Sequence, residues 1–314
     1  MSSVVEIIKG KKDKAICLTA IGEEFIRDFE KISLPHFRAY AKKYDLGLLL
    51  LKDYLVEKQK LHKPYDSNPN FQRLLFPQYI KKNFPNYKYI CDIDIDCLPG
   101  PVARNIFDFT NFENRNDIFL TTPVPPNFLR KDIGKRISLL RQIFQNKDFP
   151  LDSLLSASDE DEKKIYDTHF SGHIAVIGTC VANVEILSEI FLEVYDRIST
   201  NFGGYLQLLT NKYFRDLGNV KWLPYEFQAI WNYEVALNYP FLFSKKYSHL
   251  AKSCVLQSLL KVDMLHFAGN WKENKIFKEG PFLKFDNEMD VFFESLPSFL
   301  DKDIEIKSYN KISD

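Results

Sequence analysis

The chain has 314 residues, which is enough for one large α/β domain or two small ones with substantial cores. Its 42 Lys and Arg residues balance 42 Asp and Glu residues, and this balance excludes a general nucleic-acid binder whose affinity rests on a basic surface. No run approaches the roughly 18 apolar residues that a membrane-spanning helix needs.

The N-terminal 14 residues lack the long apolar region of a signal peptide. The five cysteines are scattered, without CxxC spacing, which is typical of reduced and buried thiols; they are Cys17, Cys91, Cys97, Cys180 and Cys254. We therefore expect a cytoplasmic protein. A peripheral contact with the inner face of the membrane stays open, because residues 239–260 mix aromatic and basic side chains.

The first part of the chain alternates strand and helix patterns. The apolar run at 15–20 predicts a buried strand, a helical pattern follows to residue 43, and residues 46–51 predict a second buried strand. Strand, helix and strand in this order predict a βαβ unit and a parallel sheet. Residues 71–83 then form a helical pattern that leads into the apolar run at 87–90.

The later part contains fewer clear signals. We predict a strand at 118–122, a polar helical stretch, a second strand and an amphipathic helix, the last three at 130–164, 169–178 and 184–198. Neither an internal repeat nor a low-complexity linker interrupts the sequence. The organisation expected is therefore one domain over 1–285, followed by a helix and charged tail over 286–314.

The most informative segment is the run from Cys91 to Cys97, which contains three aspartates at alternate positions. In an extended strand, Asp92, Asp94 and Asp96 would all point to one face. Carboxylates this close repel one another and raise one another's pKa, so a divalent cation between them is the first ligand to consider.

The aspartate run also allows three other interpretations. A calcium loop of the EF-hand type would need glycine at its sixth position and Glu at its twelfth, where this chain has Cys97 and Ala103. The aspartate nucleophile of haloacid-dehalogenase-like phosphatases also follows a strand, but usually the first strand of the chain. An acidic strand end without a function is the third alternative.

A second element strengthens the metal reading. His266 follows a short apolar run, and Gly269 and Lys272 come three and six residues later. A histidine at a strand end can complete the oxygen-rich shell of Mn²⁺ (or Mg²⁺). Gly269 would let the backbone approach a phosphate closely, and Lys272 would supply a positive charge. Alone, His266 would more often be a hydrogen-bonded core residue.

These two elements together resemble a known family. Asp94-Ile95-Asp96 is similar to the DxD motif of GT-A glycosyltransferases, and His266-x-x-Gly269-x-x-Lys272 is similar to the C-terminal motif of glycosyltransferase family 8. That family includes bacterial lipopolysaccharide galactosyl- and glucosyltransferases and glycogenin. Further matches extend the resemblance over most of the chain: Arg73-Leu74-Leu75-Phe76-Pro77, the segments 170–177 and 206–211, and Trp222-Leu223-Pro224.

The resemblance implies an α/β fold of GT-A type, with a Rossmann-like, mostly parallel mixed sheet flanked by helices. It implies Mn²⁺ or Mg²⁺ at Asp94, Asp96 and His266, while Asp92 remains inside the strand. It also implies a UDP-sugar held by Arg73, Gly269 and Lys272. Because ligands bind outside the carboxyl ends of strands in open α/β sheets, Thr19 and Ala20 at the end of the first predicted strand are expected to contact the nucleoside.

The implied activity is transfer of a hexose, with retention at the anomeric carbon, to a glycan or lipid-linked glycan acceptor of the lipopolysaccharide or surface-polysaccharide kind. Gln207 would lie near the anomeric carbon. The family's neighbouring aspartates are replaced here by Leu206 and Leu208. A degenerate protein that binds a sugar nucleotide or glycan without catalysis is therefore the alternative, and the phosphatase is the third reading.

Overall fold

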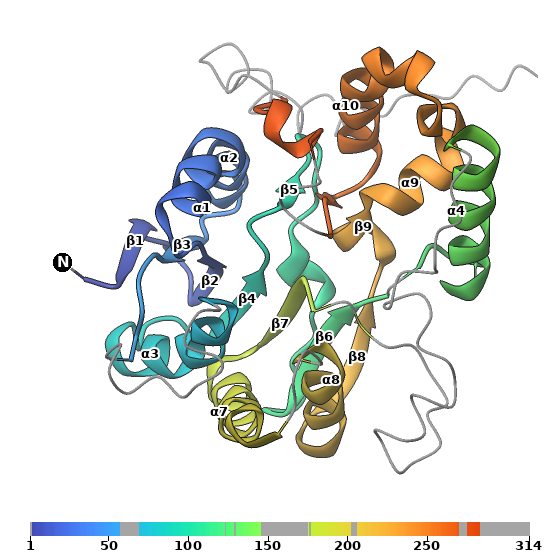
Figure 1. The fold of residues 1–314 in the computed structure, drawn as a ribbon. Helices are drawn as coiled ribbons and strands as arrows, with labels where there is room; N and C mark the ends of the chain where they lie inside the picture. The colour runs from blue at the N-terminus through green and yellow to red at the C-terminus, as the bar shows by residue number, and fades with distance from the viewer. Residues whose placement is uncertain are drawn as a thin grey trace, which may run out of the picture.

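The computed structural model describes residues 2–56, 69–122, 124–128, 130–145, 175, 177–201, 206–269 and 275–282. Ten strands form two sheets in this part of the chain (Figure 1). The larger sheet has, in spatial order, β1 (Val4–Ile8), β3 (Gly47–Leu51), β2 (Lys14–Thr19), β4 (Tyr89–Ile93), β7 (Thr179–Asn183), β6 (Asp117–Thr121) and β8 (Asn219–Leu223).

Most strands of the larger sheet run in one direction. The pairs β2/β3, β2/β4 and β6/β8 are parallel, whereas β1 runs against β3 and β7 runs against both β4 and β6. The predicted mixed, mostly parallel sheet is therefore confirmed, including the parallel βαβ unit formed by β2 and β3.

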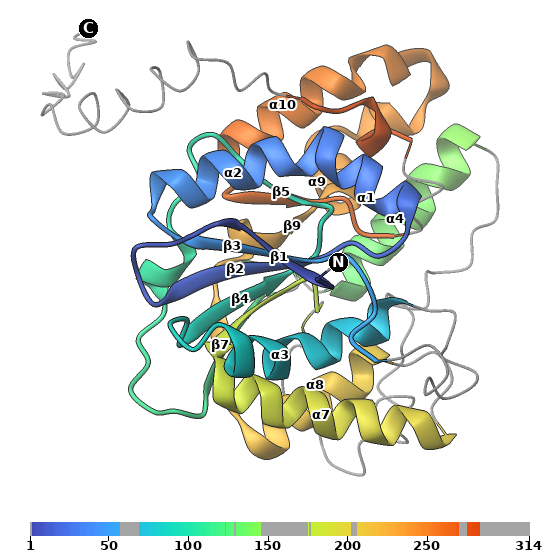
Figure 2. The ribbon, with the colours of Figure 1, turned by 90° about the vertical axis from the view of Figure 1, so that its left-hand side faces the viewer.

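Helices cover both faces of this sheet. On one side lie α3 (Phe76–Asn83), α7 (Val184–Asn201) and α8 (Leu206–Leu217); on the other lie α1 (Glu23–Asp28) and α2 (Leu34–Lys43), joined by a π-helical turn at Phe29–Ser33 (Figure 2). The alternation of side chains along each strand produces the two layers. In β2, for example, Ala15 and Cys17 pack toward the first set of helices, and Ile16 and Leu18 toward the second.

The smaller sheet lies on the α1/α2 side and has the order β5 (Cys97–Pro99), β10 (Met264–His266) and β9 (Ala229–Ile230). A separate apolar cluster packs it against α4 (Arg130–Gln145), α9 (Trp231–Asn238) and α10 (Ala251–Lys261). β5 follows β4 after only three residues, so the chain passes directly from the larger sheet into the smaller one. This passage is where the aspartate run lies.

Several element predictions are confirmed and others are wrong. The strands at 15–20, 46–51 and 118–122 and the helix at 184–198 are confirmed as β2, β3, β6 and α7, and the helical pattern at 71–83 is a 3-10 turn at Pro69–Leu75 followed by α3. The predicted polar helix is confirmed only as α4, since its later part, most of the strand predicted at 169–178 and the tail at 286–314 lie outside the described residues. The prediction did not include β1, β7 or β8.

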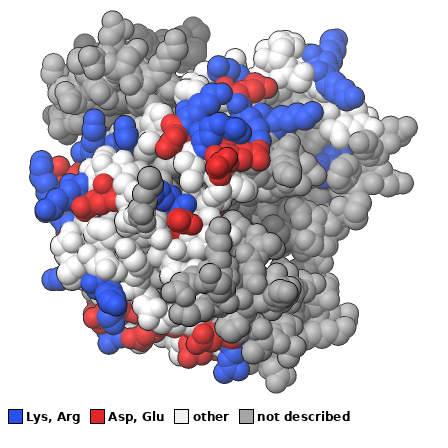
Figure 3. Space-filling model, turned by 60° about the vertical axis from the view of Figure 1, so that its left-hand side comes forward, with Lys and Arg blue, Asp and Glu red and all other residues white. Residues whose placement is uncertain are grey.

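The charge distribution on the surface and the state of the cysteines agree with what the sequence predicts. Basic and acidic side chains lie beside one another on the face drawn in Figure 3. All five cysteines are buried and free, as predicted. Within the described ranges, no helix combines the length and the apolar character that a bilayer crossing requires.

His36 gives the fold a predicted pH dependence. This α2 residue is buried, and its Nδ1–H donates to the carbonyl oxygen of Pro99 over 2.9 Å. Burial lowers its pKa from 6.5 to about 4, so the unfolded chain takes up a proton first as the pH falls. The stability that neutral His36 confers is fully present above the unfolded pKa and is lost as the pH falls toward the folded one.

Between pH 7 and pH 5 this loss should be about 2 kcal/mol. Urea unfolding at the two pH values measures it. His36→Gln keeps a donor for Pro99 but cannot be protonated, and this variant should lose that share of the pH dependence. An unchanged difference between the two pH values would show that other groups cause it.

Candidate metal and donor site

Asp94, Ile95 and Asp96 form a turn between β4 and β5. The Asp94 N–H donates to the carbonyl oxygen of Gly178 over 2.8 Å, and the Cys97 N–H donates to the carbonyl oxygen of Asp94 over 3.0 Å. The prediction that three aspartates share one face of a continuous strand is therefore wrong. β4 ends at Ile93 because the chain must turn here to enter the smaller sheet.

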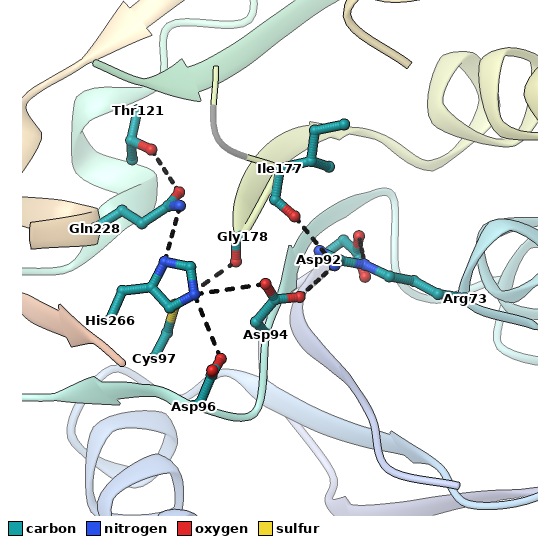
Figure 4. Close-up of polar contacts among 10 residues, drawn as sticks. All are labelled: Arg73, Asp92, Asp94, Asp96, Cys97, Thr121, Ile177, Gly178, Gln228 and His266. Carbon is teal, nitrogen blue, oxygen red and sulfur yellow. Dashed lines mark hydrogen bonds and ion pairs between the residues drawn. The ribbon is translucent and has the colours of Figure 1, made fainter. Parts of the chain in front are cut away.

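His266 meets this turn from the other end of the chain. It is the last residue of β10, where it pairs with Cys97 of β5 and Ile230 of β9. Its Nε2 atom lies 3.4 Å from Oδ1 of Asp96 and 3.7 Å from Oδ2 of Asp94 (Figure 4). The imidazole is buried, whereas the Asp94 side chain is 34% exposed, so a ligand can reach the site from the Asp94 side.

The charges at this junction favour a cation. Burial raises the pKa of Asp94, and the neighbouring Asp96 raises it further, although Arg73 and His266 oppose the shift. Burial alone would lower the pKa of His266, but the neighbouring Cys97 and Asp96, together with a hydrogen bond that the imidazole donates to Asp96, raise it well above its usual value. Two carboxylates and an imidazole thus crowd together, and a bound cation would relieve the repulsion between the carboxylates.

Arg73 balances the aspartates from the α3 side. Its Nε donates to Oδ2 of Asp92 over 2.5 Å, and its Nη1 donates both to Asp94 and, over 3.1 Å, to the carbonyl oxygen of Ile177. Asp92 points into the core from β4, where burial raises its pKa to about 6 against the pull of Arg73. Asp92 is therefore a structural carboxylate, in agreement with the sequence-based expectation.

One nitrogen of Arg73 stays available to a ligand. Its Nη2 atom is buried and has no hydrogen-bond partner among the described residues. Such an atom carries a desolvation cost that a bound acceptor would remove. Contact between Arg73 and the donor, which the family resemblance implies, would therefore have to use Nη2.

The donor atoms suit a hard divalent metal. Within the described residues, Asp96, Cys97 and His266 each offer an atom within 4.8 Å of the others, and Asp94 lies beside them. Burial raises the pKa of Cys97 to about 11, so this residue remains a thiol, which is a poor ligand. The remaining set of two carboxylates and one imidazole fits Mn²⁺, and it fits Mg²⁺ less well because Mg²⁺ prefers oxygen ligands.

Two of the other predicted donor contacts lie at the same edge. Thr19 is the last residue of β2. Leu18 of β2 pairs with Ile93 of β4, and Thr19 and Asp94 come directly after these two paired residues. The Thr19 hydroxyl is buried and has no partner among the described residues. The N–H of the next residue, Ala20, donates to the carbonyl oxygen of Leu51, which leaves only its carbonyl and methyl groups for a nucleoside.

The remaining predicted contacts are placed only in part. Gly269 has φ 129°, a conformation that favours glycine, and apart from its chain neighbours no atom of the described residues lies within 4 Å of the position where a Cβ would be. Lys272 lies outside the described residues. Gln207 belongs to the first turn of α8, but its side chain is not among those described.

Asn211, four residues after Gln207, connects α8 to the chain that leads to the site. Its side-chain amide exchanges two hydrogen bonds of 2.9 Å with the backbone of Ala175. Ala175 and Asn211, one from each of the two sequence segments at 170–177 and 206–211, therefore meet in space.

A buried polar group that the sequence-based prediction did not include lies behind His266. The Thr121 hydroxyl donates to Oε1 of Gln228 over 2.6 Å, and Nε2 of Gln228 lies 3.1 Å from Nδ1 of His266. Gly178 lies against this pair, since a Cβ there would be 2.6 Å from Gln228 Nε2 and 2.7 Å from His266 Cε1. No local sequence pattern marks Thr121, Gln228 or Gly178, because these residues come from separate strands and turns.

The sheet order, the flanking helices and the aspartate turn together define an α/β protein with the GT-A glycosyltransferase fold. The chain is similar to the bifunctional glycosyltransferase WbbM, with a TM-score of 0.51 and 13% identity over 83% of this chain and 46% of that one. It thus spans less than half of the WbbM chain.

Two further solved structures are similar at lower scores. One is a glycosyltransferase involved in the glycosylation of the major capsid of PBCV-1, with a TM-score of 0.46 and 12% identity over 88% of this chain and 99% of that one. The other is the galactosyltransferase LgtC in complex with donor and acceptor sugar analogues, with a TM-score of 0.44 and 13% identity over 87% and 98%. No protein-family model and no curated protein matches the sequence.

Proposed function

We propose that this protein is a metal-dependent, retaining glycosyltransferase that moves a hexose from a UDP-sugar to a hydroxyl of a glycan or lipid-linked glycan. The observation that carries the proposal is the meeting of Asp94, Asp96 and His266 at the carboxyl edge of the larger sheet. In open α/β sheets this edge is where ligands bind. The buried Arg73 Nη2 and Thr19 Oγ1 atoms, which lack described partners, support a polar ligand there.

A Mn²⁺ or Mg²⁺ ion held by Asp94, Asp96 and His266 would supply positive charge to the diphosphate leaving group. Arg73 and Lys272 would add to this charge, and Thr19 and Ala20 would face the nucleoside. Gln207 is an amide and a poor nucleophile, so a covalent glycosyl intermediate on it is not expected. We infer a front-face substitution, in which the acceptor hydroxyl attacks from the side of the leaving group while Gln207 stabilises the charge on the sugar.

A thermal-shift screen of UDP-hexoses with and without Mn²⁺ tests this proposal. A ligand present at about 100 times its Kd stabilises the folded state by about 2.7 kcal/mol, so the correct donor should raise the Tm by roughly 5 °C. We expect that shift to require Mn²⁺ and to be accompanied by slow hydrolysis of the same UDP-sugar. GDP- and CMP-sugars serve as controls.

A second function is supported by Leu206 and Leu208, which stand where the family has carboxylates. A non-catalytic protein that binds a sugar nucleotide would show the Mn²⁺-dependent shift without turnover, even with acceptors present. If no UDP-sugar binds or reacts, the transferase proposal is wrong. Hydrolysis of a simple phosphate monoester would instead favour the phosphatase.

A further inference from the structure

A pocket of about 310 Å³ lies between α4, α9 and the beginning of α10, which stand beside one another in Figure 1. Its third wall is the pair of 3-10 turns at Pro240–Phe243 and Lys245–Leu250, which lead into α10. The pocket opens to solvent, and none of Asp94, Asp96 and His266 lines it. It is therefore a second concave site, distinct from the metal site.

The floor of this pocket is apolar and its rim is polar. Ile137, Trp231 and Val235 line it and are each at most 9% exposed. Asn232 and Ser248 also line it, but their side chains are exposed to solvent. An apolar lining with a few polar groups that fix orientation is the usual composition of a small-molecule site.

The walls of the pocket carry positive charge, although the chain as a whole has a formal net charge of zero. Residues 133–145 of α4 and residues 239–261 contain neither Asp nor Glu. The basic residues of these two segments are Lys135, Arg136, Arg141, Lys245, Lys246, Lys252 and Lys261. The only acidic residue of α9 is Glu234, which is 3% exposed and accepts a hydrogen bond from Asn238. The pocket therefore attracts an anionic ligand.

Arg141 is the basic side chain that lines the pocket itself. It is half-buried and already interacts within the protein. A guanidinium has five N–H donors, so Arg141 can keep that interaction and still donate to a ligand. Its planar fork matches a carboxylate or a phosphate group.

We propose that this pocket is a second sugar-binding site, whose ligand is a hexose that bears a carboxylate or phosphate group. Its volume is at the lower end of the roughly 300–1,000 Å³ of small-molecule pockets, which suits a single ring. The apolar floor fits the C–H face of a pyranose, and the amide and hydroxyl groups of the rim fit its hydroxyls. Arg141 meets the anionic group.

The floor of the pocket is held by the strands of the smaller sheet. Trp231 directly follows Ile230, which pairs with His266, and its ring lies 6.0 Å from that of Phe267 and 6.1 Å from that of Tyr239. The aromatic floor is therefore in place before a ligand binds. Binding here requires neither a metal ion nor a nucleotide, so the site can be tested separately from the proposed function.

NMR titration of the full chain, followed on the tryptophan indole N–H signals without Mn²⁺ or nucleotide, tests the site. Glucuronate and glucose 6-phosphate should each move the signal of Trp231, which Trp231→Phe identifies, and leave that of Trp222 on β8 in place. Glucose lacks the group that pairs with Arg141 and should bind at least about tenfold more weakly. Inorganic phosphate lacks the ring and should also bind more weakly than glucose 6-phosphate.

Three results of this titration would overturn the proposal. The first is an unmoved Trp231 signal with both anionic sugars. The second is equal affinity for glucuronate and glucose, which would exclude a role for the charge. The third is equal affinity for inorganic phosphate and glucose 6-phosphate, which would exclude recognition of the ring.

Two variants of α4 separate the role of Arg141 from the general charge of the helix. Arg141→Gln should weaken the binding of glucuronate at least about tenfold and leave the binding of glucose nearly unchanged. Lys135→Gln removes the same charge from an exposed position outside the pocket, and it should change either affinity by less than about twofold. Equal losses from the two variants would overturn the role of Arg141.

An added carboxylate gives a second comparison at exposed positions, where the fold should tolerate it. Asn232→Asp places a negative charge on the rim and should abolish the binding of both anionic sugars. Gln142→Glu adds the same charge to α4 outside the pocket and should have little effect. A similar effect of both variants would overturn the assignment of the site to this pocket. Since no metal or nucleotide is present, a chain that binds glucuronate here but no UDP-sugar would support the pocket and contradict the proposed function.

Discussion

Asp96→Asn is expected to weaken Mn²⁺ binding by more than about 100-fold, because even residues behind metal ligands contribute roughly 10- to 100-fold. Of the two described carboxylates beside His266 Nε2, that of Asp96 is the nearer and the more buried. The hydrolysis of a UDP-sugar should fall to a similar extent. Calorimetric titration of Mn²⁺ and an assay of released UDP measure the two effects.

Asp92→Asn is the informative comparison for this variant. Asp92 points into the core and contacts Arg73, so its amide variant should retain Mn²⁺ affinity within a few-fold. Asp216→Asn, a surface change in an exposed pair with Lys212, controls for the loss of a negative charge. Equal losses for Asp92→Asn and Asp96→Asn would contradict the division between a structural and a ligand carboxylate.

The largest effect on stability is expected for Arg73→Met. This change leaves the carboxylate of Asp92, which is 2% exposed, without its cation, and breaking a buried ion pair costs about 3–5 kcal/mol. The stability of Arg73→Lys should lie between those of the natural chain and Arg73→Met, because an ammonium group cannot donate to both aspartates in the fork geometry of a guanidinium. Guanidinium-induced unfolding at pH 7 measures the free energies.

A double variant identifies the cause of this loss. If Arg73→Met destabilises by stranding a charge, then Asp92→Leu in the same chain should recover at least about 2 kcal/mol, since apolar replacements of buried ion pairs are often neutral. A loss that persists unchanged in the double variant would mean that packing of the Arg73 side chain, and not charge, is responsible. The cycle also yields the coupling energy between the two residues.

Much of the fold could be predicted because local patterns specify it. The apolar runs of β2 and β3 and the amphipathic pattern of α7 need no distant partner to be recognised. β7 could not be located in this way, because apolar residues stand on both sides of Gly178, at 174–177 and at 180–182. β1 was missed because it is a short edge strand whose partner, β3, lies some forty residues further along the chain.

The site was predictable only where its motifs are local. Asp94 and Asp96 stand out as a pair, and His266 stands out with Gly269 and Lys272 behind it. The turn that replaces the expected strand depends on the small sheet, which pairs residues more than 160 positions apart. Gln228 comes just before β9, and its contact with His266 depends on the pairing of β9 with β10, so no local pattern could have marked it.

The joining of the two sheets also has a consequence for the order in which the chain is made. All seven strands of the larger sheet lie between Val4 and Leu223, whereas β9 and β10 come later. During synthesis from the N-terminus, the aspartates of the turn therefore exist well before His266 does. Arg73 is already present at that stage, and its pairing with Asp92 and Asp94 would keep these carboxylates compensated until the final strands arrive.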